Sequence, residues 1–123
     1  MPRYVHFEHY VDDAQKTIDF YQKVFDWKLE KFGDMPYWLV TSGPEGEPGI
    51  DGGISQSEPP NGQRVVNTIG VEDIDATVER ARKAGAKVVA EKMPIVGMGW
   101  VAYLVDPSGI VFGLFSMDEH AGM

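Results

Sequence analysis

The sequence aligns with itself when it is shifted by 60 residues, and this internal repeat limits the possible folds more than any other feature. The shift matches Val11-Asp12-Asp13 with Val71-Glu72-Asp73, Thr17-Ile18-Asp19 with Thr77-Val78-Glu79, Gly49-Ile50 with Gly109-Ile110, and Gly53-Ile54 with Gly113-Leu114. The order of the expected secondary-structure elements repeats as well. The chain therefore reads as one structural module used twice.

Each half begins with a strand that leads into a helix. Strands are expected over residues 4–11 and 65–71, each followed by an acidic helix N-cap at Asp12 or Asp13 and at Asp73. Apolar residues then recur at helical spacing, at Ala14, Ile18, Tyr21 and Phe25 in the first half and at Ile74, Val78 and Ala81 in the second. Gly85 is suited to end the second helix.

Three strands are expected after each helix, over residues 27–32, 37–41 and 50–56 and over residues 87–90, 100–105 and 111–116. We therefore predict an α+β fold with a single domain over residues 1–123, built from two βαβββ repeats at residues 4–56 and 64–117. Residues 57–63, with two prolines and Asn61-Gly62, are the expected linker. One helix covers one face of each sheet, which leaves the other face free to enclose a ligand.

Composition excludes several classes of partner. The net charge of −8 would repel the phosphate backbone of nucleic acids and an anionic membrane surface, so we expect neither as a partner. No apolar run approaches the roughly 20 residues of a membrane-spanning helix, and Met1-Pro2-Arg3-Tyr4 lacks the apolar core of a signal peptide. Without cysteine there is no disulfide and no thiolate metal site. A cytoplasmic location is the expectation.

Several short motifs, taken in order, resemble the vicinal-oxygen-chelate superfamily of glyoxalases, bleomycin- and fosfomycin-resistance proteins and extradiol dioxygenases. They are His6, Val11-Asp12-Asp13 before Ile18-Asp19-Phe20-Tyr21, Val71-Glu72-Asp73-Ile74 before a helix ending at Ala84-Gly85-Ala86, and Asp106-Pro107-Ser108-Gly109 before the last strand. The resemblance covers residues 4–117. It implies that the two modules form a half-open barrel, whose open face we call the cup.

The resemblance also implies a divalent metal in the cup, held by His or Glu side chains from the first and last strands of each module. There the metal acts as a Lewis acid on two adjacent substrate oxygens. In this chain only His6 is a competent ligand at such a position. The others fall on Val66 (or Asn67 after a one-residue slip), Gly53 and Gly113. Catalytic sites usually keep three protein ligands, so we expect neither the usual metal site nor another cofactor.

The first strand carries the strongest candidates for a site. Its alternation places His6, Glu8 and Tyr10 on the cup face, and Val5, Phe7 and His9 on the face toward the helix. Residues two apart on a strand lie about 7 Å apart at Cα, close enough to share a proton or a small ion. His6 and Glu8 therefore have three possible roles: a hydrogen-bonded pair, ligand contacts, or acid and base in catalysis.

Other candidates depend on the resemblance or on composition. Relatives place a substrate-contacting tyrosine at the position of Tyr103, and Asn67 is the polar residue closest to the metal-ligand position of the second module. With these, the predicted ligand-binding residues are His6, Glu8, Tyr10, Asn67 and Tyr103. Residues 94–99 form a glycine-containing loop that is either a lid over the cup or an ordinary connection.

Three functions are consistent with this sequence. The first is a glyoxalase-like protein whose cup binds a small molecule without the usual metal. The alternative is a lyase- or isomerase-type enzyme, acting on vicinal oxygens, with a non-standard site around His6 and Glu8. The third is an interaction subunit whose cup is vestigial. We expect a homodimer; pairing of the modules within one chain or across the dimer, and catalytic activity itself, stay open.

Overall fold

The computed structural model describes residues 1–123, which divide into two compact units. We call His6–Val65 the first module, and Val66–Met123 together with Met1–Val5 the second module. The first strand, β1 (Arg3–Tyr10), thus begins in the second module and ends in the first. The helices are short, and none of them is long and apolar enough to cross a membrane.

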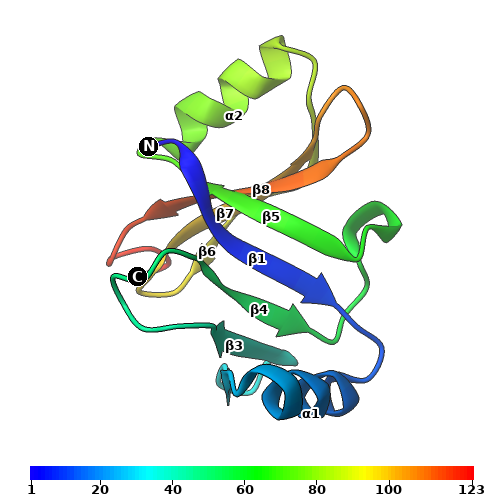
Figure 1. The fold of residues 1–123 in the computed structure, drawn as a ribbon. Coiled ribbons are helices and arrows are strands. Elements are labelled where there is room, and N and C mark those ends of the chain that lie inside the picture. The colour runs from blue at the N-terminus through cyan, green and yellow to red at the C-terminus, as the bar shows by residue number, and fades with distance from the viewer. The chain divides into compact units, whose positions relative to one another are not determined.

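The first module contains α1 (Ala14–Phe25), β2 (Lys28–Lys31), β3 (Tyr37–Thr41) and β4 (Asp51–Ser55) in addition to the larger part of β1. Its strands pair in the order β2–β3–β4–β1, and Figure 1 shows β3, β4 and β1 side by side. β4 runs parallel to β1, whereas β3 is antiparallel to both of its neighbours. The module ends in a short 3₁₀ turn, η1 (Pro60–Gly62), inside the predicted linker.

Helix α1 packs its first half against this sheet. Of the two predicted cap residues, Asp12 and Asp13, it is Asp13 whose side chain caps the helix by accepting from the backbone N–H of Lys16. Ala14 and Ile18 are buried with Val40 of β3 and Ile54 of β4. Phe25, predicted to continue the buried stripe, is 53% exposed, so that prediction was wrong for the last turn. Tyr21, Phe25 and Trp27 stack on one another there instead.

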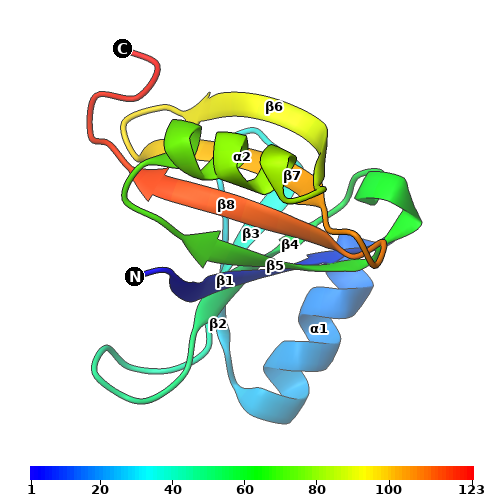
Figure 2. The ribbon, with the colours of Figure 1, turned by 90° about the horizontal axis from the view of Figure 1, so that it is seen from above.

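The second module contains β5 (Val65–Gly70), α2 (Ile74–Lys83), β6 (Lys87–Ile95), β7 (Gly99–Val105) and β8 (Val111–Met117). Its strand order is β5–β8–β7–β6, with β8 parallel to β5. Figure 2 shows α2 lying across one face of these strands. The core between helix and sheet consists of Val71, Ile74, Ala102, Leu104 and Leu114.

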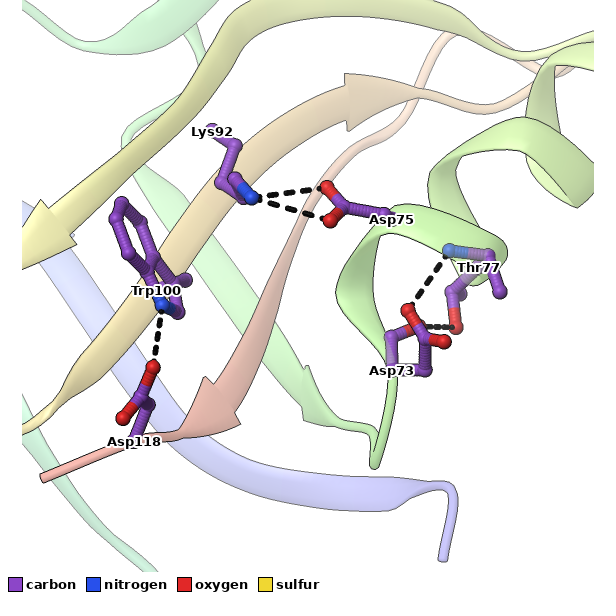
Figure 3. Close-up of polar contacts among 7 residues, drawn as sticks. Asp73, Asp75, Thr77, Lys92, Trp100 and Asp118 are labelled. Atoms are coloured by element: carbon purple, nitrogen blue, oxygen red, sulfur yellow. Dashed lines mark hydrogen bonds and ion pairs between the residues drawn. The ribbon is translucent and has the colours of Figure 1, made fainter. Parts of the chain in front are cut away.

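Both ends of α2 satisfy backbone groups that a helix leaves unpaired. Asp73 accepts from the backbone N–H of Ala76, and its carbonyl accepts from the Thr77 hydroxyl at 2.8 Å (Figure 3). At the other end Gly85 has φ +107°, and the N–H of Ala86 returns to the carbonyl of Ala81. This is the glycine-terminated end that the sequence predicted.

Polar contacts tie the edge of the second module to its helix and to the C-terminal segment. Lys92 of β6 pairs with Asp75 in the first turn of α2 at 3.1 Å, and the indole N–H of Trp100 donates to Asp118 at 3.0 Å (Figure 3). The Lys92 ammonium also lies 4.7 Å from the centroid of the Trp100 ring. The long edge strand β6 is thereby fixed to its surroundings.

Strand β6 is longer than predicted. It runs to Ile95, and Pro94 and Ile95 pair with Trp100 and Gly99 of β7. The register shifts twice between Val88 and Met93, so one residue is inserted at each shift and the alternation of side chains is interrupted. Because of this interruption, the strand predicted from periodicity ended at Ala90. Residues 94–99 consequently form the hairpin that joins β6 to β7.

The predicted α+β fold of two βαβββ modules is confirmed. The repeat also holds at the level of single pairs. Glu8 is opposite Gly53 in the parallel pair of the first module, and Thr68 is opposite Gly113 in that of the second. Glu8 and Thr68 are 60 residues apart, and so are Gly53 and Gly113, so the structural register equals the register of the sequence repeat.

Candidate binding site

The alternation of β1 is as the sequence predicted. Phe7 packs against the core of the first module, and the His9 ring meets the ring of Tyr21 on α1 at 6.0 Å between centroids. His6, Glu8 and Tyr10 lie on the opposite face. Val5 belongs to the second module, where its side chain lies next to Gly70. A slip of one residue would have exchanged the two sets of side chains.

Glu8 is at the centre of the polar side chains on that face. It is only 7% exposed, and a buried carboxylate needs hydrogen bonds to offset its lost hydration. Tyr10 donates to Oε1 at 2.9 Å, and Tyr37 donates to Oε2 at 2.8 Å. Each oxygen of Glu8 thus accepts a hydrogen bond from a tyrosine hydroxyl.

His6 extends this arrangement through Tyr37. Its Nε2 lies 2.8 Å from the Tyr37 hydroxyl oxygen. The single proton of that hydroxyl already goes to Glu8, so the His6 Nε2–H must be the donor in the bond to Tyr37. The neutral tautomer with its proton on Nε2 leaves Nδ1 as an acceptor. We call the four residues His6, Tyr37, Glu8 and Tyr10 the Glu8 network.

Burial determines the charge state of this histidine. It lowers the pKa of His6 below the ordinary value of 6.5, and it outweighs the charges of Glu8 and Asp51, which act in the opposite direction. His6 is therefore neutral at pH 7, as the tautomer assignment requires. Burial also raises the pKa of Tyr37, with the Glu8 charge as the next cause, so its hydroxyl keeps its proton.

Tyr37 is the member of the network that the sequence did not predict. It is the first residue of β3, and its ring lies over Gly53 of β4. A Cβ atom on Gly53 would overlap the hydroxyl group of Tyr37. The glycine therefore provides the space from which Tyr37 reaches both His6 and Glu8. The available signal was Gly52-Gly53 inside a predicted strand, since glycine in a strand often marks a close approach by another group.

The equivalent face of the second module is chemically different. The register makes Val66 and Thr68 the counterparts of His6 and Glu8. Asn67 is exposed, on the other face of β5 from the buried Val66 and Thr68, so the slipped alignment of Asn67 with His6 was wrong. Tyr103 pairs with Gly113. A Cβ atom on Gly113 would contact both the Thr68 side chain and the Tyr103 ring. The predicted candidates Asn67 and Tyr103 thus belong to the second module, and the other three belong to the first.

In neither module do the side chains at the positions named by the family resemblance fit a divalent metal. His6 uses Nε2 to donate to Tyr37, and the space over Gly53 is filled by the Tyr37 hydroxyl. Val66 and Gly113 offer no ligand atoms in their side chains. No three His, Asp or Glu side chains of the chain gather closely enough to hold an ion.

Known proteins resemble the chain in sequence and in fold. It is 32% identical over 123 residues to lactoylglutathione lyase GLX1 of Arabidopsis thaliana, with 91% of this chain and 43% of that protein covered. It is 31% identical over 110 residues to the lactoylglutathione lyase of Haemophilus influenzae, with 80% and 81% covered. The chain therefore spans less than half the length of the Arabidopsis relative.

The fold likeness is equally extensive. A glyoxalase/bleomycin resistance protein/dioxygenase superfamily member from Vibrio splendidus superposes with a TM-score of 0.68 at 18% identity, covering 96% of this chain and all of the other. The sequence model of the Glyoxalase/Bleomycin resistance protein/Dioxygenase superfamily matches residues 3–114. The repeat, the two βαβββ modules and this match agree, and the chain belongs to the Glyoxalase/Bleomycin resistance protein/Dioxygenase superfamily.

Proposed function

We propose that the chain binds a small organic molecule at the Glu8 network, and that it does so without a bound divalent metal. The observation that carries this proposal is the position of Tyr37. Its hydroxyl bridges His6 and Glu8 at 2.8 Å on each side, where a metal ion would otherwise need both groups as ligands. A buried, fully hydrogen-bonded carboxylate next to a neutral imidazole provides polar groups of fixed orientation for a ligand.

The absence of a metal is tested by elemental analysis of untagged protein after dialysis. We expect much less than one equivalent of zinc, nickel, manganese or iron. One tightly held equivalent of any of these metals would overturn this part of the proposal, because ligands other than those described here would then have to exist.

Binding is tested with a small-molecule screen by thermal shift. A molecule that binds the native state raises the melting temperature, because it stabilises the native state by a free energy that grows with the logarithm of 1 plus its concentration over Kd. His6→Ala should abolish the shift caused by such a molecule. His120→Ala is the matched control, since His120 is an exposed histidine of the second module and should leave the shift unchanged. Equal shifts in both variants would refute binding at the Glu8 network.

A lyase or isomerase is the second candidate, and the neutral His6 favours it. Its Nδ1 can accept a proton from a carbon next to a carbonyl group, and the bond from Nε2 through Tyr37 to Glu8 holds the imidazole in place. The two relatives named above are lactoylglutathione lyases. Proton exchange of hydroxyacetone in D₂O, followed by NMR, tests this candidate. Exchange that is faster than in buffer and lost in His6→Ala would support it.

We further propose that the protein is a homodimer. Phe20, Val24 and Phe25 of α1 are each more than half exposed, and apolar side chains gathered on one helix commonly mark a contact surface. Sedimentation equilibrium measures the mass directly. A monomer mass of 13.7 kDa at all concentrations would rule this proposal out.

A further inference from the structure

Every proton of the Glu8 network is used inside the network. The Tyr10 and Tyr37 hydroxyls have one proton each, and both protons go to Glu8. The ring proton of neutral His6 goes to the Tyr37 oxygen. A hydroxyl that has donated its proton can only accept a further bond, and a carboxylate only accepts. None of the four side chains has a polar proton left for a ligand.

What the network offers to a ligand is therefore acceptor atoms. The clearest of them is Nδ1 of His6, which the Nε2–H tautomer leaves as a lone pair. The local charge has the same sign: Glu8 and Asp51, which lies opposite His6 on β4, both act on the imidazole as negative charges. A ligand group that donates hydrogen bonds complements these atoms, whereas a carboxylate or phosphate would place acceptor against acceptor.

We propose that the Glu8 network selects organic molecules whose polar end donates hydrogen bonds, above all amidines and protonated amines, and discriminates against carboxylates and phosphates. This assignment of the ligand class depends on the proposed function, since it concerns the same site. The ligand class follows from the count of hydrogen-bond donors and acceptors, and it specifies which kind of polar group the proposed site prefers. A site that offers only hydrogen-bond acceptors strongly rejects a ligand whose polar end also only accepts, because the acceptors of the site are then left unpaired.

Matched probes test the ligand class. Benzamidine and benzoate have the same ring and a planar polar end of similar size, and ethanolamine and glycolate form an aliphatic pair. Each is titrated against protein labelled with ¹⁵N at histidine, and the ring nitrogens of His6 are followed by NMR. We expect the donor member of each pair to bind His6 about tenfold more tightly, or better.

Two variants test whether the Glu8 network causes the selectivity for donor probes. Tyr37→Phe removes the acceptor for the His6 Nε2–H, so the proton is free to move to Nδ1 and the preference for the donor probes should fall toward parity. The ¹⁵N shifts of His6 report that tautomer change directly, which a merely structural effect would not produce. Glu8→Gln introduces two N–H donors and should also reduce the preference. Glu72→Gln, the same charge change at an exposed residue of the second module, is the matched control and should leave it unaltered.

The outcomes separate the two proposals. If benzoate and glycolate move the His6 signals at equal or lower concentration than their partners, the ligand class is wrong while binding at the network stands. If no probe of either pair moves these signals, binding at the network and the ligand class are both refuted. If Tyr37→Phe changes the His6 tautomer but leaves the preference for donor probes unchanged, the positions of the protons in the network do not determine that preference.

Discussion

The two modules share one backbone frame and differ in the side chains placed on it. In both, the first and last strands are parallel neighbours with the same register, Glu8 opposite Gly53 and Thr68 opposite Gly113. The first module carries the Glu8 network on that frame. In the second, the counterparts of His6 and Tyr10 are Val66 and Gly70, which have no polar side-chain atoms.

This difference shows which positions preserve the fold and which are available for a site. Ile54 and Leu114 are equivalent core residues, and both are 1% exposed. Their environment of helix and sheet is the same in kind, so both positions stay large and apolar. The face away from each helix is not constrained in this way. Its residues differ between modules without any change of register.

The largest effect is expected from the shared frame. Ile54→Ala and Leu114→Ala should each lower the free energy of unfolding by roughly 2–5 kcal/mol, from lost transfer energy and the cavity left behind. Denaturation by urea measures both. A nearly neutral result at one of the two positions would break the equivalence of the modules.

The next largest effect concerns the position at which the modules differ. Glu8→Ala leaves the half-buried Tyr37 hydroxyl without its acceptor and creates a cavity at the buried Glu8 position, so we expect a loss of about 2–4 kcal/mol. Thr68→Ala, at the equivalent buried position, removes fewer atoms and should cost about 1 kcal/mol. The same denaturation experiment compares the two. Equal losses would mean that the Glu8 network adds no stability beyond ordinary packing.

The opposing glycines sharpen the comparison further. In Gly53→Ala the new methyl group overlaps the Tyr37 hydroxyl, so the ring has to leave both His6 and Glu8, at about 1–3 kcal/mol. In Gly113→Ala the nearest atom is the Thr68 hydroxyl oxygen, 2.6 Å from the new Cβ, and a side-chain rotation relieves the contact for about 1 kcal/mol or less. NMR of His6 should show a changed environment in the first variant.

A carboxylate at Gly53 meets the same obstacle. Gly53→Glu, with His6 kept, places beside His6 in the first module one of the ligand types that the family resemblance implies, and we expect it to raise the affinity for divalent metal. Isothermal titration with Zn²⁺ measures that affinity. Because any side chain at Gly53 displaces Tyr37, the gain should be larger when Tyr37→Ala is added. No gain in a folded Gly53→Glu with Tyr37→Ala double variant would contradict the position assigned to Gly53.

The smallest effect is that of pH on stability, and it should come from the first module. Burial is the first cause that lowers the pKa of His6 and of His9 below 6.5, so below that pH the unfolded chain binds more protons than the native one. Stability should therefore fall as pH drops from about 7.5 to about 5. The variant His6→Gln with His9→Gln should flatten this slope.

A second loss of stability, at lower pH, comes from aspartates and can be told apart from the effect of the histidines. Hydrogen bonds, chiefly from Ser108 and from Trp100, lower the pKa values of Asp106 and Asp118 in the second module below 3.8, and their contribution disappears only at lower pH. Urea midpoints measured across both ranges separate the two. A slope above pH 5 that survives removal of both histidines would contradict the assignment.

The sequence by itself determined the features that depend on local periodicity and on the repeat. The βαβββ order, the caps at Asp13 and Asp73, and the face assignment of His6, Phe7 and Glu8 all follow from spacings of two or about four residues within single elements. The alternation predicted that Phe7 packs toward α1, and it does. These features are encoded where they occur, so reading the chain in order was enough.

Only the tertiary structure decided the contacts that join distant strands. Tyr37 is 29 residues from Glu8 and 31 from His6 in sequence, and it reaches them because β3 pairs with β4 and Gly53 has no side chain in the way. Gly52-Gly53 signals that some group approaches this strand closely, but no local pattern identifies that group as Tyr37. The same holds for β6, whose inserted residues hide the strand from periodicity, and for Asn67, whose face was fixed only by the pairing of β5 with β8. Strand pairing acts between residues far apart in sequence, and the register it selects depends on which side chains the whole module can bury.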